Sequence, residues 1–355
     1  MANNNDKKVL NVPDLRFPEF SGEWVETELQ DIVPNICSGK DRISNSGEVA
    51  LYGSTGVIGR TNSASYKENI VLVARVGANA GQMQIGNAPC GVTDNTLVID
   101  AKEWNYYIYY FLQHYNLNRL VFGSGQPLIT GGMLKRIKVR YGCKAERNNI
   151  TRLLCLIDER IATQNKIIEK LQSLIKGIRN NMMIQNQGDY IALQDIADIY
   201  QPKTILSTDL TEDGYLVYGA NGIIGKYHLY NHEKEQICIT CRGNTCGTVN
   251  YTEPKSWITG NAMVINTDNF AENVNKRYLF HYLSSINFNS IISGSGQPQI
   301  VRQPLAKLKI ILPELTIQEH IAKCLDTILA KIKNEQTSLQ AIQIQKSYLL
   351  SQMFI

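Results

Sequence analysis

The pentapeptide GSGQP stands at 123–127 and again at 294–298, each time after an aromatic-rich segment. The separation between matching segments is 164 residues at the first match, 166 at a glycine-rich loop and 171 at the last. Ordered matches with a slowly growing separation indicate one unit that is built twice, with small loop insertions. The matches are LQDI at 29–32 and 193–196, YGSTGVIG at 52–59 and YGANGIIG at 218–225, VLVARVGANAG ending at 81 and ICITCRGNTCG ending at 247, VTDNTLVI at 92–99 and ITGNAMVI at 258–265, and YIYYFLQHYNLNRLVFGSGQP from 107 and YLFHYLSSINFNSIISGSGQP from 278.

Within each copy, short runs rich in Val, Ile and Tyr alternate with Gly, Asn, Ser and Thr, which is typical of strands joined by tight turns. Strands are expected at 70–75 and 97–100, with counterparts at 236–240 and 263–265. A single helix at 104–122, with a counterpart at 274–292, is expected before each GSGQP segment. Each globular unit is therefore predicted to be mixed, and the fold class to be α+β.

Each copy closes with a different pattern, in which apolar residues recur in alternating steps of four and three. Such a stripe predicts a helix packed along another helix. A helix of about 33 residues is roughly 50 Å long, which is too long to serve one small domain. The predicted seam consists of Ile150, Leu154, Ile157, Ile161, Gln164, Ile168 and Leu171 in the first copy and Ile321, Leu325, Ile328, Ile332, Glu335, Leu339 and Ile342 in the second.

The expected architecture has two similar domains, at 1–145 and 188–315, separated by two long antiparallel helices, at 146–187 and 316–355, about a pseudo-two-fold axis. Gln164 and Glu335 are 171 residues apart and interrupt the two stripes at equivalent places. One interpretation is that they meet near the pseudo-dyad and set the register through a hydrogen bond. The other is that both long side chains reach solvent.

Composition narrows the class of protein. The 355 residues are 43% apolar and 19% charged, as in a globular protein, and the net charge of +4 permits a polyanionic partner without requiring one. No secretory signal is visible, and no apolar run approaches the ~18 residues of a membrane span, so a cytoplasmic location is expected.

Cys238, Cys241 and Cys246 suggest a zinc site, with two histidines upstream. Their counterparts in the first copy are Leu72, Arg75 and Ala80, so the repeated unit does not need a metal there. Buried core thiols are the alternative, and no metal site is predicted.

The chain resembles a known family, the specificity subunits of Type I restriction-modification systems. The resemblance covers nearly the whole chain. It is carried by LRFPEFSGEWVETELQDI at 15–32, the two glycine loops, and LPELTIQEHIAKCLDTILAKI at 312–332. The first copy departs from the last motif and reads YGCKAERNNITRLLCLIDERI at 141–161, without the proline or the Gln-Glu pair.

The resemblance implies that each globular unit is a target-recognition domain and that the two read a bipartite sequence in double-stranded DNA. The long helices would set the spacer and bind two methylation subunits, and restriction subunits would join them. S-adenosylmethionine and ATP would be bound by those partners, and this chain would carry no cofactor and no catalytic residue.

Basic residues near the loops suit DNA phosphates, and Asn, Gln and Arg at loop tips suit base edges. For each residue alone, a solvated surface side chain is the alternative, and Gln126 and Gln297 recur in both copies as a framework position would. The predicted phosphate contacts are Lys40, Arg42, Arg60, Arg119, Lys203, Lys226 and Arg302, and the predicted base contacts are Arg75, Asn79, Gln126, Arg242, Asn244 and Gln297.

Two other functions share some of these features. A coiled-coil adaptor would have the same heptads without DNA binding, and a nucleotide- or sugar-handling enzyme could use the glycine loops. The sequence contains no phosphate-binding loop with a Gly-Lys-Ser/Thr ending, no His-Glu-x-x-His and no Asn-Pro-Pro-Tyr or Asp-Pro-Pro-Tyr motif. These absences favour a recognition protein over an enzyme.

Overall fold

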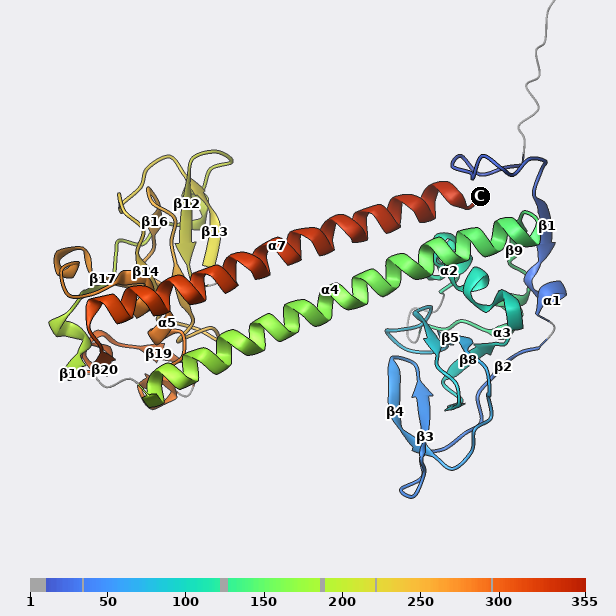
Figure 1. The fold of residues 1–355 in the computed structure, drawn as a ribbon, viewed down its shortest axis with the longest axis horizontal. Helices are drawn as coiled ribbons and strands as arrows, with labels where there is room; N and C mark the ends of the chain where they lie inside the picture. The colour runs from blue at the N-terminus through green and yellow to red at the C-terminus, as the bar shows by residue number, and fades with distance from the viewer. Residues whose placement is uncertain (1–10, 34, 122–126, 186–188, 221, 295) are drawn as a thin grey trace, which may run out of the picture. The chain divides into compact units, whose positions relative to one another are not determined.

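A computed structural model describes residues 11–33, 35–121, 127–185, 189–220, 222–294 and 296–355 (Figure 1). The chain forms two compact units. Unit 1 comprises Met1–Asn165 and Ser338–Ile355, and unit 2 comprises Lys166–Thr337. The boundary between the units falls inside both long helices, so each helix contributes one part to each unit.

Unit 1 is built on two small sheets. The four-stranded sheet has the antiparallel order β2-β8-β5-β6, and the three-stranded sheet has the order β4-β3-β7, with β3 parallel to β7. A separate pair joins β1 and β9. The strands are β1 Val25–Glu28, β2 Ile36–Ser38, β3 Val49–Gly53, β4 Gly56–Thr61, β5 Ile70–Ala74, β6 Met83–Gly86, β7 Cys90–Val92, β8 Thr96–Ile99 and β9 Lys138–Tyr141.

Unit 2 repeats this topology strand for strand. Its sheets have the orders β11-β17-β14-β15 and β13-β12-β16, and β10 pairs with β20. Unit 2 also contains the short hairpin β18-β19. The predicted duplication and the expected strands are confirmed. The strands are β10 Asp189–Ala192, β11 Asp198–Tyr200, β12 Tyr215–Gly219, β13 Gly222–Tyr227, β14 Ile237–Thr240, β15 Val249–Tyr251, β16 Trp257–Ile258, β17 Ala262–Asn266, β18 Ile292–Ser293, β19 Gln299–Ile300 and β20 Lys309–Leu312.

The central strand β5 is apolar throughout because both of its faces are covered. Val71 and Val73 lie in a core shared with α2 and the long helices, whereas Ile70 and Leu72 lie in a second core with Tyr52 of the smaller sheet. Successive side chains of a strand point to opposite faces, so a strand between two layers needs apolar residues at every position.

The same geometry explains Cys238 of unit 2. Cys238 lies on β14 in the core cluster between the two sheets, with Tyr218 and Val264, and burial raises the pKa of its thiol. It occupies the place that Leu72 has in unit 1. Among the described residues, no group of three or more His, Cys, Asp or Glu side chains is arranged to hold a metal ion.

The helix before each GSGQP segment is shorter than predicted. The first, α2 (Asn105–Tyr115), ends because Asn116 adopts φ +59°, and a 3-10 turn at Leu117–Leu120 follows. Its counterpart is α5 (Lys276–Leu283). The prediction of unbroken helices at 104–122 and 274–292 was wrong, since apolar residues beyond the helix ends pack from 3-10 turns. The remaining short helices are α1 Leu29–Ile32, α3 Gly131–Lys135 and α6 Arg302–Ala306.

The two long helices are α4 (Lys144–Gln185) and α7 (Leu315–Met353). In unit 1, Ile150 and Leu154 of α4 share a core with Met353 and Phe354 at the opposite end of the chain, so the helices run antiparallel there. In unit 2, α4 and α7 also lie side by side, and Ile175 lines the same hollow as residues of α7. Each predicted seam residue from Ile150 to Leu171 and from Ile321 to Ile342 is buried or half-buried.

The two helices begin differently. At the start of α7, Gln318 is fully buried, accepts a hydrogen bond from the Asn275 backbone N–H at 2.8 Å and donates to the Pro313 carbonyl at 2.7 Å. Arg147 occupies the equivalent place in α4, where its guanidinium carbon lies 3.4 Å from the centre of the Trp104 ring. A cation–π contact thus replaces an amide network.

No helix within the described ranges combines the length and apolar character needed to cross a membrane.

Candidate nucleic-acid interface

In unit 1, the loop between β5 and β6 holds the end of the GSGQP segment. Gly77 N–H donates to the Pro127 carbonyl at 3.0 Å, and Ile129 N–H donates to the Arg75 carbonyl at 2.9 Å. Both bonds join backbone atoms, so the pairing tolerates changes in the side chains that project from the loops.

The β3-β4 turn is attached to the same loops. Asn95 accepts two hydrogen bonds at its carbonyl, from Arg75 N–H at 3.0 Å and from Ser54 Oγ at 3.1 Å. Gln84 Nε2 donates to the Gly53 carbonyl at 2.7 Å. We call the segments 53–56, 75–82, 93–95 and 127–129 the unit 1 loop cluster.

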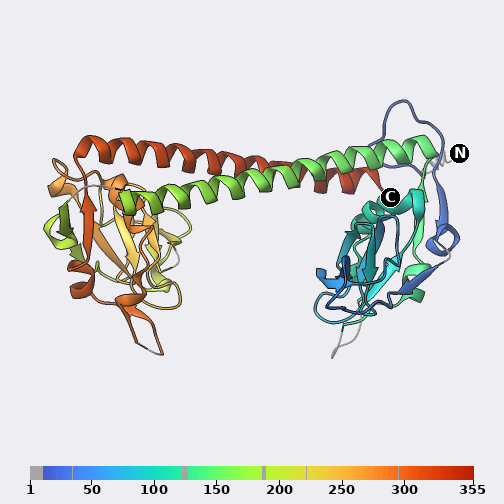
Figure 2. The same cartoon turned by 60° about the horizontal axis from the view of Figure 1, so that its bottom comes forward.

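Unit 2 builds the equivalent cluster from 219–220, 222, 241–247, 259–261 and 298–300. Gly243 N–H donates to the Pro298 carbonyl at 2.9 Å, which repeats the bond made by Gly77. Thr240 and Thr245 donate from their hydroxyls to the Ala220 carbonyl at 2.6 Å and 3.0 Å. The β18-β19 hairpin projects from this part of unit 2 (Figure 2).

Four of the six predicted base contacts lie in these clusters. Arg75 and Asn79 are half-buried in the β5-β6 loop, whereas Arg242 and Asn244 in the matching loop of unit 2 are exposed. Gln297 is exposed beside the β18-β19 hairpin. Gln126 lies outside the described residues.

The predicted phosphate contacts of unit 1 lie around its cluster. Lys40 and Arg42 are exposed and line a hollow of about 440 Å³ together with Asp94. Arg119 is exposed on the 3-10 turn after α2, with its guanidinium 5.1 Å from the Tyr115 ring centre. Arg60 is farther along β4, where its Nη1 donates to the Glu48 carbonyl at 2.7 Å.

The three predicted phosphate contacts of unit 2 differ in the partners that their side chains already have within the protein. Lys203 is exposed after β11, at the place that Lys40 has after β2. Lys226 on β13 lies 3.7 Å from the Asp213 carboxylate. Arg302 is exposed, but its Nε donates to the Ile199 carbonyl at 2.7 Å, which gives the side chain a structural role as well.

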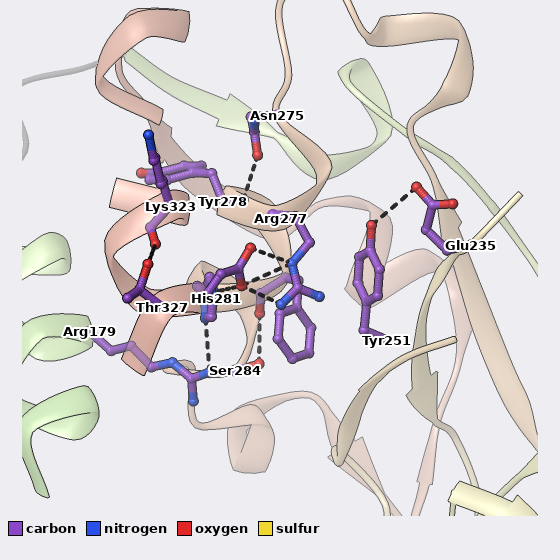
Figure 3. A network of polar contacts seen from close by, with 12 residues as sticks. Arg179, Glu235, Tyr251, Asn275, Arg277, Tyr278, His281, Ser284, Lys323 and Thr327 are labelled. Atoms are coloured by element: carbon purple, nitrogen blue, oxygen red, sulfur yellow. Dashed lines mark hydrogen bonds and ion pairs between the residues drawn. The ribbon is translucent and has the colours of Figure 1, made fainter. Parts of the chain in front are cut away.

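A polar network that the sequence analysis missed connects the globular domain of unit 2 to both long helices (Figure 3). Arg277 of α5 forms an ion pair with Asp326 of α7 through several short contacts. His281 of α5 is fully buried and lies 2.8 Å from Asp326 through Nε2 and 3.0 Å from Arg179 of α4 through Nδ1.

The charge states in this network follow from its burial. Burial lowers the pKa of His281 to about 4, against an unperturbed 6.5, so the ring is neutral at pH 7. Burial also opposes the charged form of Asp326, but hydrogen bonds from Arg277 and His281 lower the pKa of this carboxyl below its usual value. A neutral ring with one donor and one acceptor nitrogen can bridge a carboxylate and a guanidinium only through one tautomer, with the proton on Nε2.

Unit 1 makes the same connection with different chemistry. Tyr110 of α2 stands where His281 stands in α5, and its hydroxyl donates to Asp158 of α4 at 2.9 Å. Lys346 of α7 forms an ion pair with the same carboxylate at 2.7 Å. Burial raises the pKa of Tyr110, so the hydroxyl keeps its proton. The repeat alignment places Tyr110 opposite His281, but their acidic partners do not align, because the position that matches Asp326 is Cys155 and not Asp158.

A duplicated mixed domain, a loop cluster in each copy and two long helices define a two-domain recognition protein. The sequence model of the Type I restriction modification DNA specificity domain matches residues 21–181 and 189–343, and the chain belongs to this family.

Known relatives carry names of the same kind. The chain is 29% identical over 150 residues to a Haemophilus influenzae protein named for a type I restriction enzyme specificity subunit, over 41% of this chain and 38% of the relative. It is 31% identical over 112 residues to the EcoprrI specificity subunit of Escherichia coli, over 32% of this chain and 27% of the relative. The chain thus spans less than half the length of these two relatives in the matched regions.

Two further likenesses extend over nearly the whole chain. The MjaVIII specificity subunit of Methanocaldococcus jannaschii is 23% identical, with 94% of this chain and 91% of the relative covered. The crystal structure of the S subunit of a Type I restriction-modification system from M. genitalium superposes with a TM-score of 0.74 at 17% identity, covering 97% of this chain and 99% of that one. The expected fold class is confirmed.

Proposed function

We propose that this chain is the sequence-specificity subunit of a Type I restriction-modification complex and that each recognition domain reads one half of a bipartite DNA site. The observation that carries the proposal is the pair of loop clusters. Backbone bonds such as Gly77 to Pro127 and Gly243 to Pro298 are the same in both units. The side chains projecting from the two clusters differ, as they must if one framework reads two different half-sites.

The long helices support a second role, the docking of two methylation subunits. Several large apolar residues on α4 and α7 point outward instead of into the seam. A helix that already buries one apolar stripe has no structural need for a second one, so these residues favour a further helical partner. They are Leu156, Ile344 and Tyr348 in unit 1 and Ile167, Leu174 and Ile317 in unit 2.

Catalysis would then belong to the partners. We infer that the methylation subunits bind S-adenosylmethionine, that restriction subunits use ATP, and that this chain selects the site without reacting. The lack of a methyltransferase or phosphate-loop motif in the sequence supports this division of roles.

A domain exchange tests the proposal. The complete complex is expressed in cells, and adenine methylation is sequenced across the genome. Residues 16–140 are then replaced by the matching segment of another specificity subunit. We expect one half of the methylated sequence to change while the other half and the spacer stay the same.

The same measurement separates the alternatives. If the complex of this chain with its methylation subunits methylates no defined sequence, the adaptor interpretation is favoured. If the exchange changes both halves of the site, or neither half, the assignment of one half-site to each domain is wrong.

A further inference from the structure

Each unit exposes large aliphatic side chains at the same place, on the second strand of its glycine-loop hairpin. In unit 1, Val57 and Ile58 on β4 are 57% and 48% exposed, and in unit 2, Ile223 and Ile224 on β13 are 56% and 44% exposed. Both strands lie at the edge of their sheets. Exposing aliphatic side chains to water is unfavourable, so exposure retained in both copies indicates a surface that is covered in the working complex.

One isoleucine of each pair lies at a β-bulge in its hairpin. The register of the hairpin shifts directly after Leu51 in unit 1 and directly after Val217 in unit 2. In each case the extra residue is an isoleucine, Ile58 or Ile224, which has no partner across the hairpin. Bulges of this kind redirect a side chain and are frequent beside functional sites.

The glycines of the YGSTGVIG and YGANGIIG loops make room for these side chains. A Cβ atom on Gly53 would lie 2.9 Å from Cγ2 of Ile58, and one on Gly219 would lie 2.9 Å from Cδ1 of Ile224. The isoleucine therefore lies across the turn in both units. The repeated glycines are explained by this close approach, in addition to the turn itself.

A third aliphatic residue completes each surface. A Cβ on Gly59 would lie 3.5 Å from Ile43, and one on Gly225 would lie 3.0 Å from Leu210, so these two residues occupy matching places. We call the two sets the hairpin patches. They consist of Ile43, Val57 and Ile58 in unit 1 and Leu210, Ile223 and Ile224 in unit 2.

Basic residues border both hairpin patches. Ser44 N–H donates to the Arg60 carbonyl at 2.9 Å, which holds Arg42 and Ile43 alongside β4. In unit 2, Thr211 N–H makes the matching bond to the Lys226 carbonyl at 2.8 Å. The Asp213 carboxylate is 3.7 Å from Lys226 and moderates its charge. An apolar centre with basic neighbours is complementary to a nucleic-acid groove lined by phosphates.

The hairpin patches are also attached to the loop clusters. The β3-β4 turn is bonded to Asn95 and Gln84, and the Ala220 carbonyl of the β12-β13 turn accepts from Thr240 and Thr245. A duplex bound at a loop cluster therefore lies within reach of the hairpin beside it.

Resting on the proposed function, we propose that the two hairpin patches are apolar wedges that press into the DNA groove at each half-site and unstack a base step. The two patches are both aliphatic and occupy matching places, although the two domains would read different sequences. A base-reading contact would have diverged, whereas a contact that deforms the duplex without reading it can stay the same in both copies.

The test uses the complete methylation complex and a duplex carrying the site found by methylation sequencing. The fluorescent base 2-aminopurine is placed in turn at steps of each half-site, away from the methylated adenines, because it brightens when it is unstacked. Binding of the unaltered complex should raise its emission about twofold or more at one step in each half-site. The variant V57S/I58S should abolish the rise in one half-site only, and I223S/I224S should abolish it in the other.

Matched measurements keep the outcomes distinct. Because the altered side chains are exposed, thermal unfolding should be unchanged, and the conservative variant V57I/I58V should restore the signal. The wedge is refuted if the unaltered complex binds its site without any rise, or if the serine variants behave like the unaltered complex. Loss of methylation subunits from V57S/I58S would instead assign the patch to a protein partner and also refute it. Absence of any specific site in the unaltered complex refutes the proposed function itself.

Discussion

At the residue scale, two equivalent positions begin the long helices with different chemistry. Gln318 satisfies backbone groups from two segments, including the Asn273 carbonyl at 2.9 Å. In unit 1 the ion pair between Arg16 and Glu146, at 2.6 Å, accompanies the stacking of Arg147 on Trp104. Both solutions join the first turn of a long helix to the globular domain. In the first copy, these contacts of Arg16 and Arg147 therefore take the place of the missing proline and Gln-Glu pair.

Replacing Gln318 by Leu should destabilise unit 2 by about 2 to 4 kcal/mol, because buried backbone partners lose their hydrogen bonds. Urea unfolding of the full chain measures this change. Gln343 is exposed on the same helix, and its replacement by Leu is the matched control, expected to change stability by less than about 0.5 kcal/mol. Equal effects of the two variants would contradict the role of the Gln318 network.

The buried His281 predicts that the free energy of unfolding depends on pH. Its folded pKa of about 4 lies below its unfolded value of 6.5, so the unfolded chain binds more protons between these values. The stability that His281 contributes is complete above pH 6.5 and is lost as the pH falls toward 4. Between pH 7 and pH 5 the unaltered chain should lose about 2 kcal/mol more than a His281→Gln variant.

The charged groups around His281 are Asp326 of α7, Arg179 of α4 and Arg277 of α5. They remain in the variant, so the comparison isolates the imidazole. Unfolding curves at pH 5, 6 and 7 measure the difference, and the exposed His320, replaced by Gln, serves as the control. An identical pH slope in His281→Gln and the unaltered chain would show that His281 does not change its protonation on unfolding.

At the scale of elements, the long helix α4 carries a buried leucine on one face and exposed leucines on another. Leu154 is fully buried in the unit 1 core, whereas Leu156, two residues later, is 54% exposed. Neighbours two apart on a helix point in different directions, so the heptad pattern alone predicts this contrast.

Leu154→Ala should cost about 2 to 5 kcal/mol of unfolding free energy, because it leaves a cavity between α4 and the domain. Leu156→Ala removes the same atoms from an exposed place and should cost less than about 1 kcal/mol. It should instead weaken retention of a methylation subunit, as measured by co-purification. If Leu156→Ala retained its partner fully, this part of the helix would not be the docking surface.

At the scale of the whole molecule, the proposal makes helix length a determinant of the spacer between the half-sites. The Asp158–Lys346 ion pair shows which parts of α4 and α7 lie opposite each other in unit 1. By that register, segments 159–165 and 339–345 face one another. Each is one heptad long, so removing both preserves the seam.

Deleting 159–165 and 339–345 together should shorten the spacer by about 3 base pairs, since seven residues of helix span about 10.5 Å and one base pair about 3.4 Å. Both half-sites should stay unchanged, and methylation sequencing measures all three quantities. Deleting 159–165 alone mismatches the helices and should lower stability. An unaltered spacer in a stable double-deletion complex would show that the helices do not set it.

The sequence predicted the repeat, the strands and the seam because each has a local period. Strand β5 and the stripe from Ile150 are visible as runs of apolar residues at fixed spacing. The ends of α2 and α5 were not predicted, because one residue, Asn116, stops the first helix through its backbone angle while the apolar pattern continues. The pairing of Gln164 with Glu335 would join the two units and stays a prediction.

For the candidate site, the sequence predicted where the loops lie, but not the side chains that hydrogen-bond the loops to one another. Most of the candidate contacts lie at or beside the loops, whereas Arg60 and Lys226 lie on strands and Arg302 begins α6. The roles of all of them stay predictions. The sequence does not indicate the hairpin patches, because an exposed Ile58 and a buried Ile70 look alike in it. Only the strand order distinguishes an edge strand from a central one.

By itself the sequence determined that this protein is one α+β unit built twice and joined by heptad helices, since periodicity and repetition are local properties of the chain. Only the tertiary structure decided how each domain is connected to those helices. Tyr110 and His281 occupy equivalent positions, but their carboxylate partners are 48 and 45 residues away and do not align in the repeat. No spacing rule links such residues, because contacts made by folding depend on the path of the whole chain between them.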